Sequence, residues 1–427
     1  MKQKNIDNVL TWPVNAQDRF EYPLKYIIHV IVSFDQALDA EILGKAVRLS
    51  LDAEPILGCR FVEDEKQPYW RRCDGRDEMQ WLVCISSDNK DEAIDRFLKS
   101  SFFHEGQQIN VCLVQAAGGD SLCIKISHAC SDAGGLKEYL ELLAGIYSGL
   151  QKNPDFSPQP HTHGRRDQKH YFDDRGITDP LALFDPQAQP LPPAWGFPHH
   201  GTERKEMHMA LRRFKGGAFD RIMSFAKEHH VTMTAVLLTA MFRSMFAMLN
   251  PPLGEKMGIT VSVDLRHAFA EHADQAISNL VVGINPRISR LEEESFPETL
   301  KRASEALEEL KQNRAETVDA IGLEAWGTTD YSVFLEQLQA IVQMAAETGK
   351  TNPLLSNVGV IRALEFGQSR ATDAYMLTPV VIPPAFMLGV TTFNRTMTLQ
   401  CSFGEPGHRK EEVEAFMDLM EKELGSV

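Results

Sequence analysis

One histidine and one aspartate stand four residues apart in a stretch that could do chemistry. They lie in Ser127-His128-Ala129-Cys130-Ser131-Asp132-Ala133-Gly134-Gly135. An imidazole titrates near neutral pH, so His128 is suited to transfer a proton in a reaction at that pH. Asp132 is suited to cap the helix expected after it, and the two glycines suit a tight turn or a close approach of other atoms. The stretch therefore predicts a catalytic histidine in a loop between a strand and a helix.

The elements on either side distinguish this pair from others with the same spacing. Residues 121–127 alternate polar and apolar side chains, as in a strand with one buried face, and His128 shares the apolar parity. Residues 136–150 place apolar side chains at helical spacing. Because the chain has 14 His and 59 acidic residues, pairs four apart also arise by chance. Two such pairs lie in a Pro- and Arg-rich stretch with no strand before them: His163 with Asp167, and His170 with Asp174.

Length and composition predict a globular protein with two cores. The chain has 427 residues, of which 43% are hydrophobic, and a chain of this length normally forms more than one core. Its net charge of −15 argues against a nucleic-acid partner and against an anionic membrane surface. Residues 233–249 are the most apolar helical stretch, but their length and Arg243 predict a buried core helix and no membrane span.

The cysteines and histidines give no pattern that predicts a metal site. Seven Cys are scattered without a Cys-x-x-Cys, so we expect reduced thiols and a cytoplasmic protein. The N-terminus lacks the apolar core of a signal peptide, which agrees with this expectation. Histidines between 161 and 200 have no regular ligand spacing, and we interpret them as part of a solvated loop.

The pattern of elements divides the chain into two α/β lobes joined by a linker. Residues 1–150 form the N-terminal lobe, which carries the His128 motif. Residues 151–205 contain nine of the 22 Pro, and we expect an unpacked, His-containing crossover linker there. Residues 206–427 form the C-terminal lobe. Strands are expected at 24–34, 59–62, 79–85, 109–114, 122–127, 207–214, 258–265, 280–288, 358–361, 375–381, 385–392 and 396–403. Helices are expected at 39–51, 91–98, 136–150, 217–228, 233–249, 297–313, 331–347 and 411–424.

The motif, with the glycines after it, resembles the HxxxD motif of a large acyltransferase superfamily. That superfamily contains chloramphenicol acetyltransferase, peptide-synthetase condensation domains, alcohol acetyltransferases and plant BAHD enzymes. Ser127 stands where many members have a second His, and Ala133 separates Asp132 from Gly134; both departures argue against the peptide-bond-forming branch. Further stretches resemble the family in the right order: 43–47 through 54–61, Val263-Asp264-Leu265-Arg266, 278–283 and 356–361.

The resemblance implies a two-lobed chloramphenicol acetyltransferase-like α/β sandwich with an active-site tunnel between the lobes. It implies that His128 is the general base for direct attack on an acyl thioester, without a covalent acyl-enzyme. It also implies that Asp132 pairs with an arginine, for which Arg266 is the candidate, and that the pair holds the loop; a helix cap remains the alternative. Structural roles are expected for Gly134 and Gly135. Candidate oxyanion or substrate contacts are Ser356, Asn357 and Thr391.

The implied function is transfer of an acyl group to a hydroxyl or amine of a small-molecule acceptor. The donor would be a co-substrate, either acyl-CoA or the acyl-pantetheine arm of an acyl carrier protein, and no bound cofactor is expected. The stand-alone length and the missing second His favour ester formation by a free enzyme. Two alternatives stay open: a carrier-protein-dependent condensation enzyme, and a binding protein of this fold without turnover.

Overall fold

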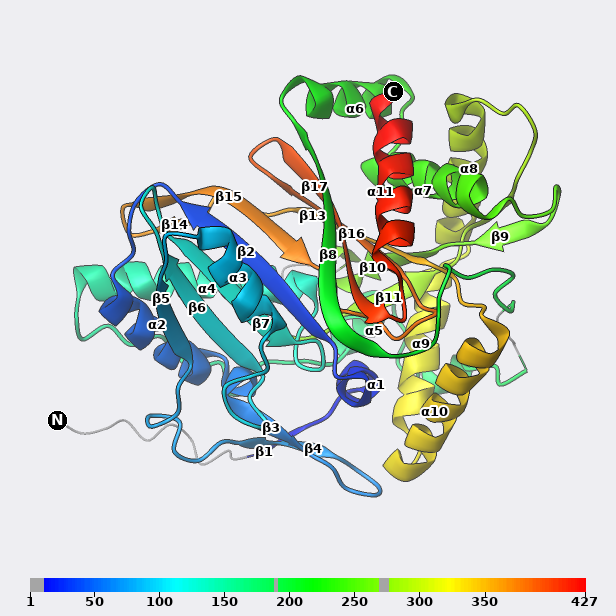
Figure 1. The fold of residues 1–427 in the computed structure, drawn as a ribbon. Helices are drawn as coiled ribbons and strands as arrows, with labels where there is room; N and C mark the ends of the chain where they lie inside the picture. Colours follow the sequence, from blue (N-terminus) through cyan, green and yellow to red (C-terminus); the bar gives the residue numbers. More distant parts are fainter. Residues whose placement is uncertain (1–10, 188–190, 269–275) are drawn as a thin grey trace.

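Two six-stranded sheets form the centres of two lobes that lie side by side (Figure 1). The computed structural model describes residues 11–187, 191–268 and 276–427. The strand order is β14-β15-β2-β7-β6-β5 in the first sheet and β11-β10-β13-β16-β17-β8 in the second. The first sheet comprises β2 (Ile27–Phe34), β5 (Leu82–Ser86), β6 (Ile109–Gln115), β7 (Ser121–Ser127), β14 (Glu365–Phe366) and β15 (Ser369–Leu377). The second comprises β8 (Arg204–Lys215), β10 (Thr260–Asp264), β11 (Val281–Ile284), β13 (Leu354–Val360), β16 (Met387–Phe393) and β17 (Thr396–Pro406). This is the two-lobed α/β architecture that the sequence predicts.

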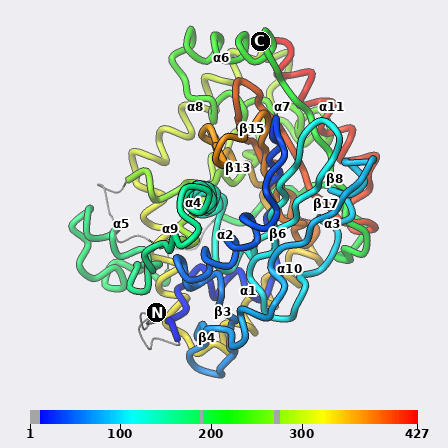
Figure 2. The backbone as a smooth tube through the Cα atoms, turned by 90° about the vertical axis from the view of Figure 1, so that its left-hand side faces the viewer, coloured from blue at the N-terminus to red at the C-terminus, as the bar shows by residue number. Residues whose placement is uncertain are grey.

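Both faces of the first sheet are covered. On one face α2 (Ala40–Ala53) and α4 (Ala133–Lys152) share a core with alternate residues of β2. Figure 2 looks along α4, which lies beside α2. On the other face Ile31 of β2 packs with α3 (Lys90–Lys99) and with Leu211 of β8 from the second lobe. Because apolar neighbours lie on both faces, β2 is a nearly continuous apolar run without strict alternation.

Helix α7 (Met233–Leu249) is the central helix of the second lobe. It shares one core with α8 (Phe296–Gln312), α11 (Lys410–Gly425), α6 (Gly217–Glu228) and the second sheet. The side chain of Thr232 caps its start by accepting from the Ala235 N–H. Among the described residues no single helix is long and apolar enough to cross a membrane. Helices α6 and α7 reach that length and apolarity only when they are taken together, and the pair is bent by 104°. The apolar character of α7 therefore reflects burial in a core, as predicted.

The first sheet is completed by chain from the second half of the sequence. Strand β15 pairs antiparallel with β2, from Ala371 opposite Phe34 to Leu377 opposite His29. Residues 365–377 thus lie in the sheet of the first lobe, although the sequence assigns them to the lobe at 206–427. Strand pairing across more than 300 residues leaves no local pattern, so the sequence alone does not predict it.

The segment expected to be an unpacked linker contains buried side chains. It forms α5 (Lys169–Asp174) and η2 (Leu181–Leu183), and Tyr171, Phe172 and Trp195 are among its buried residues. Trp195 Nε1 donates to the Gly258 carbonyl at 2.6 Å, and Phe197 stacks on Phe386 at 3.6 Å between centroids. The expectation of an unpacked linker at 151–205 is therefore wrong for these parts, because isolated aromatic residues fill gaps in the cores despite the surrounding prolines.

Most other elements form near the predicted bounds, with a few differences. The strand expected at 280–288 is two strands in different sheets, and α9 (Ala315–Gly327) was not predicted. The strand expected at 24–34 begins at Ile27, because α1 (Ala16–Leu24) precedes it. The remaining elements are β1 (Thr11–Pro13), η1 (Pro55–Gly58), β3 (Cys59–Val62), β4 (Tyr69–Arg72), β9 (Lys256–Gly258), η3 (Leu265–Ala268), β12 (Arg287–Ser289) and α10 (Tyr331–Thr348).

A buried ion pair joins α1 to the segment between the lobes. Arg166 is bidentate to Asp18, with contacts of 2.6 and 3.0 Å, and the two side chains are 8% and 0% exposed. Arg166 also donates to the carbonyls of Cys130 and Ile277, at 2.9 and 3.1 Å. One guanidinium therefore connects α1, the His128 loop and the second lobe.

We expect Arg166→Ala to destabilise the protein by about 3–5 kcal/mol, because it leaves the Asp18 carboxylate buried without its partner. Urea unfolding measures this loss. The control is Lys169→Ala, which removes an exposed pair with Asp173 and should cost less than about 1 kcal/mol. Equal effects of the two substitutions would contradict a structural role for the buried pair.

Candidate active site

His128 lies at the end of β7, where the chain turns toward α4. Its backbone N–H donates to the Tyr26 carbonyl at 2.9 Å, which continues the β2–β7 pairing by one residue. The Cys130 N–H then donates to the Ser127 carbonyl at 3.1 Å and closes the turn. The residue is 9% exposed. The imidazole is therefore held by a rigid strand end at the border between the lobes.

Asn279 from the second lobe contacts the imidazole directly. Its Nδ2 lies 3.0 Å from His128 Nδ1 and 3.3 Å from the His128 carbonyl oxygen. Its Oδ1 accepts from the Val281 N–H at 3.4 Å, and the residue is fully buried. Sequence reasoning matched 278–283 to a family strand but did not select Asn279. The available signal was an amide in an apolar stretch, since a buried polar side chain needs partners.

Asp132 caps α4 and also pairs with Arg266. One carboxylate oxygen accepts from the Gly135 N–H at 2.8 Å. The other accepts from Arg266 Nη1 at 2.9 Å and from the Leu280 N–H at 2.7 Å. Burial alone would raise the pKa of Asp132, but Arg266 and the two N–H donors hold it below its usual value. Both roles that the sequence left open are thus present in the geometry.

Arg266 is surrounded by carboxylates. Besides Asp132, it contacts Asp264 at 3.0 Å and Glu138 at 3.1 Å, and Nη2 donates to the Ser278 carbonyl at 2.7 Å. Burial alone would lower the pKa of Arg266, but the carboxylates raise it well above its ordinary value. The guanidinium is therefore a permanent cation that joins the start of α4 to the second lobe.

Glu138 is the carboxylate of this group that titrates near neutral pH. Burial raises its pKa to about 7; the positive charge of Arg266 opposes this rise, and neighbouring carboxylates add smaller contributions in the same direction as burial. Since its ordinary value is 4.5, the folded protein binds this proton more tightly than the unfolded chain does. The stability that this carboxyl group gives to the folded protein is therefore fully present below its pKa in the unfolded chain, 4.5. It is lost as the pH rises through its pKa in the folded protein, about 7.

We expect Glu138→Gln to remove this pH dependence. The free energy of unfolding of the variant, relative to the unchanged protein, should rise between about pH 5 and about pH 8. The Glu138 side chain is 42% exposed. Since solvent screens a partly exposed group, the rise should be no more than about 1 kcal/mol. Urea unfolding at both pH values measures it. Glu141→Gln, on the exposed face of the same helix, is the control and should show no such trend. If the free energy of unfolding of Glu138→Gln relative to the unchanged protein falls over this pH range, the raised pKa of Glu138 is contradicted.

The two glycines of the motif allow close approach and do not occupy the left-handed region. Neither appears among the residues with positive φ. A Cβ on Gly134 would lie 2.7 Å from Arg266 Nη1 and 2.9 Å from Asp264 Oδ2. A Cβ on Gly135 would lie 2.9 Å from the Ser278 carbonyl oxygen. Both positions therefore lack a side chain because the second lobe packs against the first turn of α4.

We expect Gly134→Ala to destabilise the protein by about 1–3 kcal/mol, because the new methyl group displaces Arg266 from its carboxylates. Thermal or urea unfolding measures the change. Gly145→Ala on the same helix is the matched control: a Cβ there meets no atom within 4 Å. That substitution should be neutral or stabilising by up to about 1 kcal/mol. If the two substitutions change the free energy of unfolding equally, the close contact between Gly134 and Arg266 does not determine the stability.

The three expected oxyanion or substrate contacts lie on the second sheet. Ser356 pairs with Ser262 at 3.2 Å, and Asn357 donates to Thr234 at 3.0 Å. The Thr391 hydroxyl is buried without a hydrogen-bond partner in the described ranges. In the part of the chain that the structure describes, none of the three is hydrogen-bonded to His128. Their suggested roles stay predictions.

A cavity of about 700 Å³ borders the histidine loop on the side of α1. Its lining includes Ser127, directly before His128, and Tyr26, whose carbonyl binds the His128 N–H. The rest of the lining is mixed: it includes the cations Lys25, Arg60 and Arg71, several aromatic side chains, and the carboxylates Glu63 and Glu105. The aromatic wall and the cations suit a ligand that has an apolar part and an anionic group.

Glu21 of α1 is a second acidic group near the imidazole. Burial raises the pKa of its carboxyl, and a positive charge on His128 opposes that rise. Its Oε2 atom is buried without a hydrogen-bond partner among the described residues. Sequence reasoning missed this residue, because no local pattern in residues 1–23 indicates that they lie beside the motif.

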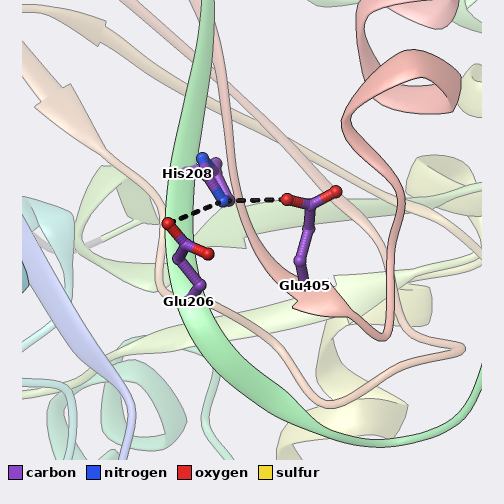
Figure 3. A group of neighbouring side chains, drawn as sticks. All are labelled: Glu206, His208 and Glu405. Carbon is purple, nitrogen blue, oxygen red and sulfur yellow. Dashed lines mark ion pairs between the residues drawn. The ribbon is translucent and has the colours of Figure 1, made fainter.

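Outside this site, two carboxylates and an imidazole gather on the paired strands β8 and β17 (Figure 3). Glu206 lies directly opposite Glu405, and His208 Nε2 is 3.0 Å from Glu405 and 3.8 Å from Glu206. The donor atoms lie within 4.8 Å of one another, close enough for one cation. The Glu206 side chain is 70% exposed, and the His208 imidazole already contacts both carboxylates. We assign no metal to this group, and the absence of a metal site stays a prediction.

The fold and the histidine loop define a member of the chloramphenicol acetyltransferase-like superfamily. Within it, the family model for the condensation domain matches residues 17–315, and the chain belongs to the condensation-domain family. No curated protein sequence matches the chain. Membership supports acyl transfer or carrier-protein condensation as the general class of activity.

Solved structures with the same fold extend over nearly the whole chain. Polyketide synthase associated protein 5 from Mycobacterium tuberculosis has a TM-score of 0.69 at 13% identity, covering 98% of this chain and 97% of that one. The first condensation domain of the CDA synthetase has a TM-score of 0.72 at 14% identity, covering 98% and 96%. The trichothecene 15-O-acetyltransferase TRI3 from Fusarium sporotrichioides has a TM-score of 0.72 at 12% identity, covering 97% and 94%. These TM-scores establish the shared fold, which confirms the predicted fold class.

Proposed function

We propose that this protein transfers an acyl group from an acyl thioester to a hydroxyl or amine of a small-molecule acceptor. The observation that carries the proposal is the setting of His128. It is nearly buried, and it comes directly after Ser127, which lines the cavity. Its imidazole is hydrogen-bonded to Asn279 of the other lobe. Such a group can exchange a proton with a substrate while bulk water is kept away.

In the proposed reaction, the acceptor attacks the thioester carbonyl directly. His128 takes the proton that the acceptor hydroxyl or amine loses as the new C–O or C–N bond forms. The tetrahedral intermediate then collapses, the C–S bond breaks, and the leaving thiolate takes the proton back from the imidazolium. Proximity of two bound substrates and one positioned base suffices for this sequence, and no bound cofactor is needed.

The neighbouring side chains support a mechanism without an acyl-enzyme. Burial raises the pKa of the Cys130 thiol well above its ordinary value, so little reactive thiolate forms. The Ser131 hydroxyl is buried and donates to the Asp132 carbonyl at 3.0 Å. Neither group is hydrogen-bonded to the imidazole in the described part of the chain, as an activated nucleophile would be.

A carrier-protein-dependent condensation is the second candidate, and membership of the condensation-domain family favours it. Acyl-CoA and a carrier-bound acyl-pantetheine both bear phosphate groups. Lys25, Arg60 and Arg71 at the cavity would suit either donor. The two candidates therefore differ in what delivers the thioester, and they share the role of His128.

We expect His128→Ala to reduce acceptor-dependent thioester turnover by about 10²–10⁴-fold, the usual contribution of a general base. The assay follows free thiol and product mass with a panel of acyl-CoAs and a pool of alcohols and amines, and then with acyl carrier proteins. His163→Ala is the matched control: its histidine is exposed and begins another pair with this spacing. Unchanged turnover in His128→Ala would sink the mechanism. Binding of thioesters without turnover by the unchanged protein would favour a non-catalytic binding protein.

A further inference from the structure

We propose that the hydroxyl group of Tyr26 donates the hydrogen bond that stabilises the oxyanion formed during acyl transfer. This role rests on the proposed function, because the oxyanion is the thioester carbonyl oxygen in that reaction. The sequence analysis expected such a group on the second sheet, at Ser356, Asn357 or Thr391. Tyr26 belongs instead to the first lobe, next to the proposed base His128.

Tyr26 and His128 are opposed residues at the end of one strand pair. The His128 N–H donates to the Tyr26 carbonyl at 2.9 Å and extends the β2–β7 register by one pair. Directly opposed side chains in an antiparallel pair lie on the same face of the sheet, with Cβ atoms about 5 Å apart. Tyr26 packs against the core that contains Ile28 and Ile126, which agrees with this face. The phenol and the imidazole therefore start from neighbouring positions.

Tyr26 also lines the cavity of about 700 Å³ beside the histidine loop. Ser127 lines the same cavity, whereas the three candidates on the second sheet are not among the described residues that do so. The cavity thus reaches both backbone neighbours of His128, one along the chain and one across the strand pair. A thioester bound in the cavity lies against the wall to which Tyr26 belongs.

The hydroxyl of Tyr26 is held in place while its hydrogen remains available. Its oxygen accepts from the Ile382 N–H at 3.1 Å, and in the described part of the chain no acceptor bonds to its hydrogen. A phenol hydroxyl has one hydrogen to donate besides the lone pairs that accept. A hydroxyl that accepts one hydrogen bond also donates another more strongly. A hydrogen-bond donor that is fixed before the reaction suits the stabilisation of a developing oxyanion.

The same hydroxyl keeps its proton at neutral pH. Burial raises the pKa of Tyr26 to about 12; the Ile382 N–H and the Arg204 cation oppose the rise, and Glu21 adds to it. The Arg204 guanidinium lies over the phenol ring, 5.6 Å from its centre. The phenol is therefore a neutral hydrogen-bond donor, and it does not compete with His128 for the role of base.

In the proposed reaction Tyr26 donates a hydrogen bond and transfers no proton. As the acceptor attacks, an electron pair of the thioester C=O bond moves onto the carbonyl oxygen, and the Tyr26 O–H stabilises the charge. The pair returns to form C=O again when the C–S bond breaks and the thiolate leaves. His128 carries the acceptor's proton, as described above. Because the charge exists only during the reaction, the hydrogen bond contributes more to kcat than to KM.

Tyr26→Phe removes the hydroxyl and keeps the ring. In the thioester turnover assay we expect kcat to fall by about 10²–10³-fold, the usual cost of one lost oxyanion donor, with little change in KM. Tyr147→Phe is the matched control: its hydroxyl also accepts from a backbone N–H, that of Asp39 at 2.9 Å, but Tyr147 does not line the cavity. It should keep its kcat. An unchanged kcat in Tyr26→Phe, with or without a raised KM, would overturn the proposal.

Infrared spectroscopy tests the hydrogen bond without turnover. The probe is the S-acetyl thioester of 4′-phosphopantetheine, labelled with carbon-13 at the carbonyl and bound to the full-length protein without an acceptor. A hydrogen bond lowers the stretching frequency of a carbonyl group. We expect a lower frequency in the unchanged protein and in Tyr147→Phe than in Tyr26→Phe, and circular dichroism checks that each variant folds. Replacement of Tyr26 by 3-fluorotyrosine, a stronger hydrogen-bond donor of nearly the same shape, should lower the frequency further. Equal frequencies in all forms would overturn the proposal.

The two measurements separate this proposal from the proposed function. A frequency that depends on Tyr26 in a protein without any turnover would overturn acyl transfer and leave Tyr26 as a hydrogen-bond donor to a bound thioester. Turnover that does not depend on Tyr26 would overturn the role of Tyr26 and leave acyl transfer standing. A protein that neither binds the probe nor turns over any thioester would overturn both.

Discussion

Residues 277–280 of the second lobe are held by several buried groups, and the place of His128 depends on that arrangement. In such a setting a lost partner is not replaced by water, so the segment cannot slide along the first lobe without leaving polar groups unpaired. The imidazole is consequently fixed relative to both lobes. The contacts are Arg166 to the Ile277 carbonyl, Arg266 to the Ser278 carbonyl, Asn279 to His128, and the Leu280 N–H to Asp132.

Two buried cations, Arg166 and Arg266, make many of these contacts. They fix the geometry of the site more than they stabilise the fold. A buried ion pair is weak evidence for stability, since the desolvation of both charges offsets the attraction between them. A bidentate arginine nevertheless defines both the distance and the orientation of its partner. Arg166 fixes the position of α1 relative to the turn at Cys130, whereas Arg266 fixes the position of the start of α4. The loop that carries His128 is therefore braced at both of its ends.

Sequence reasoning predicted the elements around the site because their patterns are local. The alternation before His128 and the helical spacing after it concern residues that are neighbours in the chain. Glu21, Arg166 and Asn279 had no such signal, because their importance arises from pairings across more than 100 residues. The exchange of β15 into the first sheet was missed for the same reason. Polar residues in apolar or irregular stretches were the usable hint, since each has to find a partner once it is buried.

The ion pair of Asp132 with Arg266 acts on the loop, and the neutral amide of Asn279 contacts the ring itself. The carboxylate of Asp132 is directed at α4 and Arg266, whereas Asn279 contacts the imidazole. A carboxylate in the place of Asn279 would favour the imidazolium, because opposite charges stabilise each other strongly where water is excluded. A group that is to take a proton from a substrate has to be neutral beforehand. The arrangement therefore separates two requirements: permanent ion pairs hold the backbone, and an uncharged neighbour orients the ring without supplying a charge that would hold a proton on it.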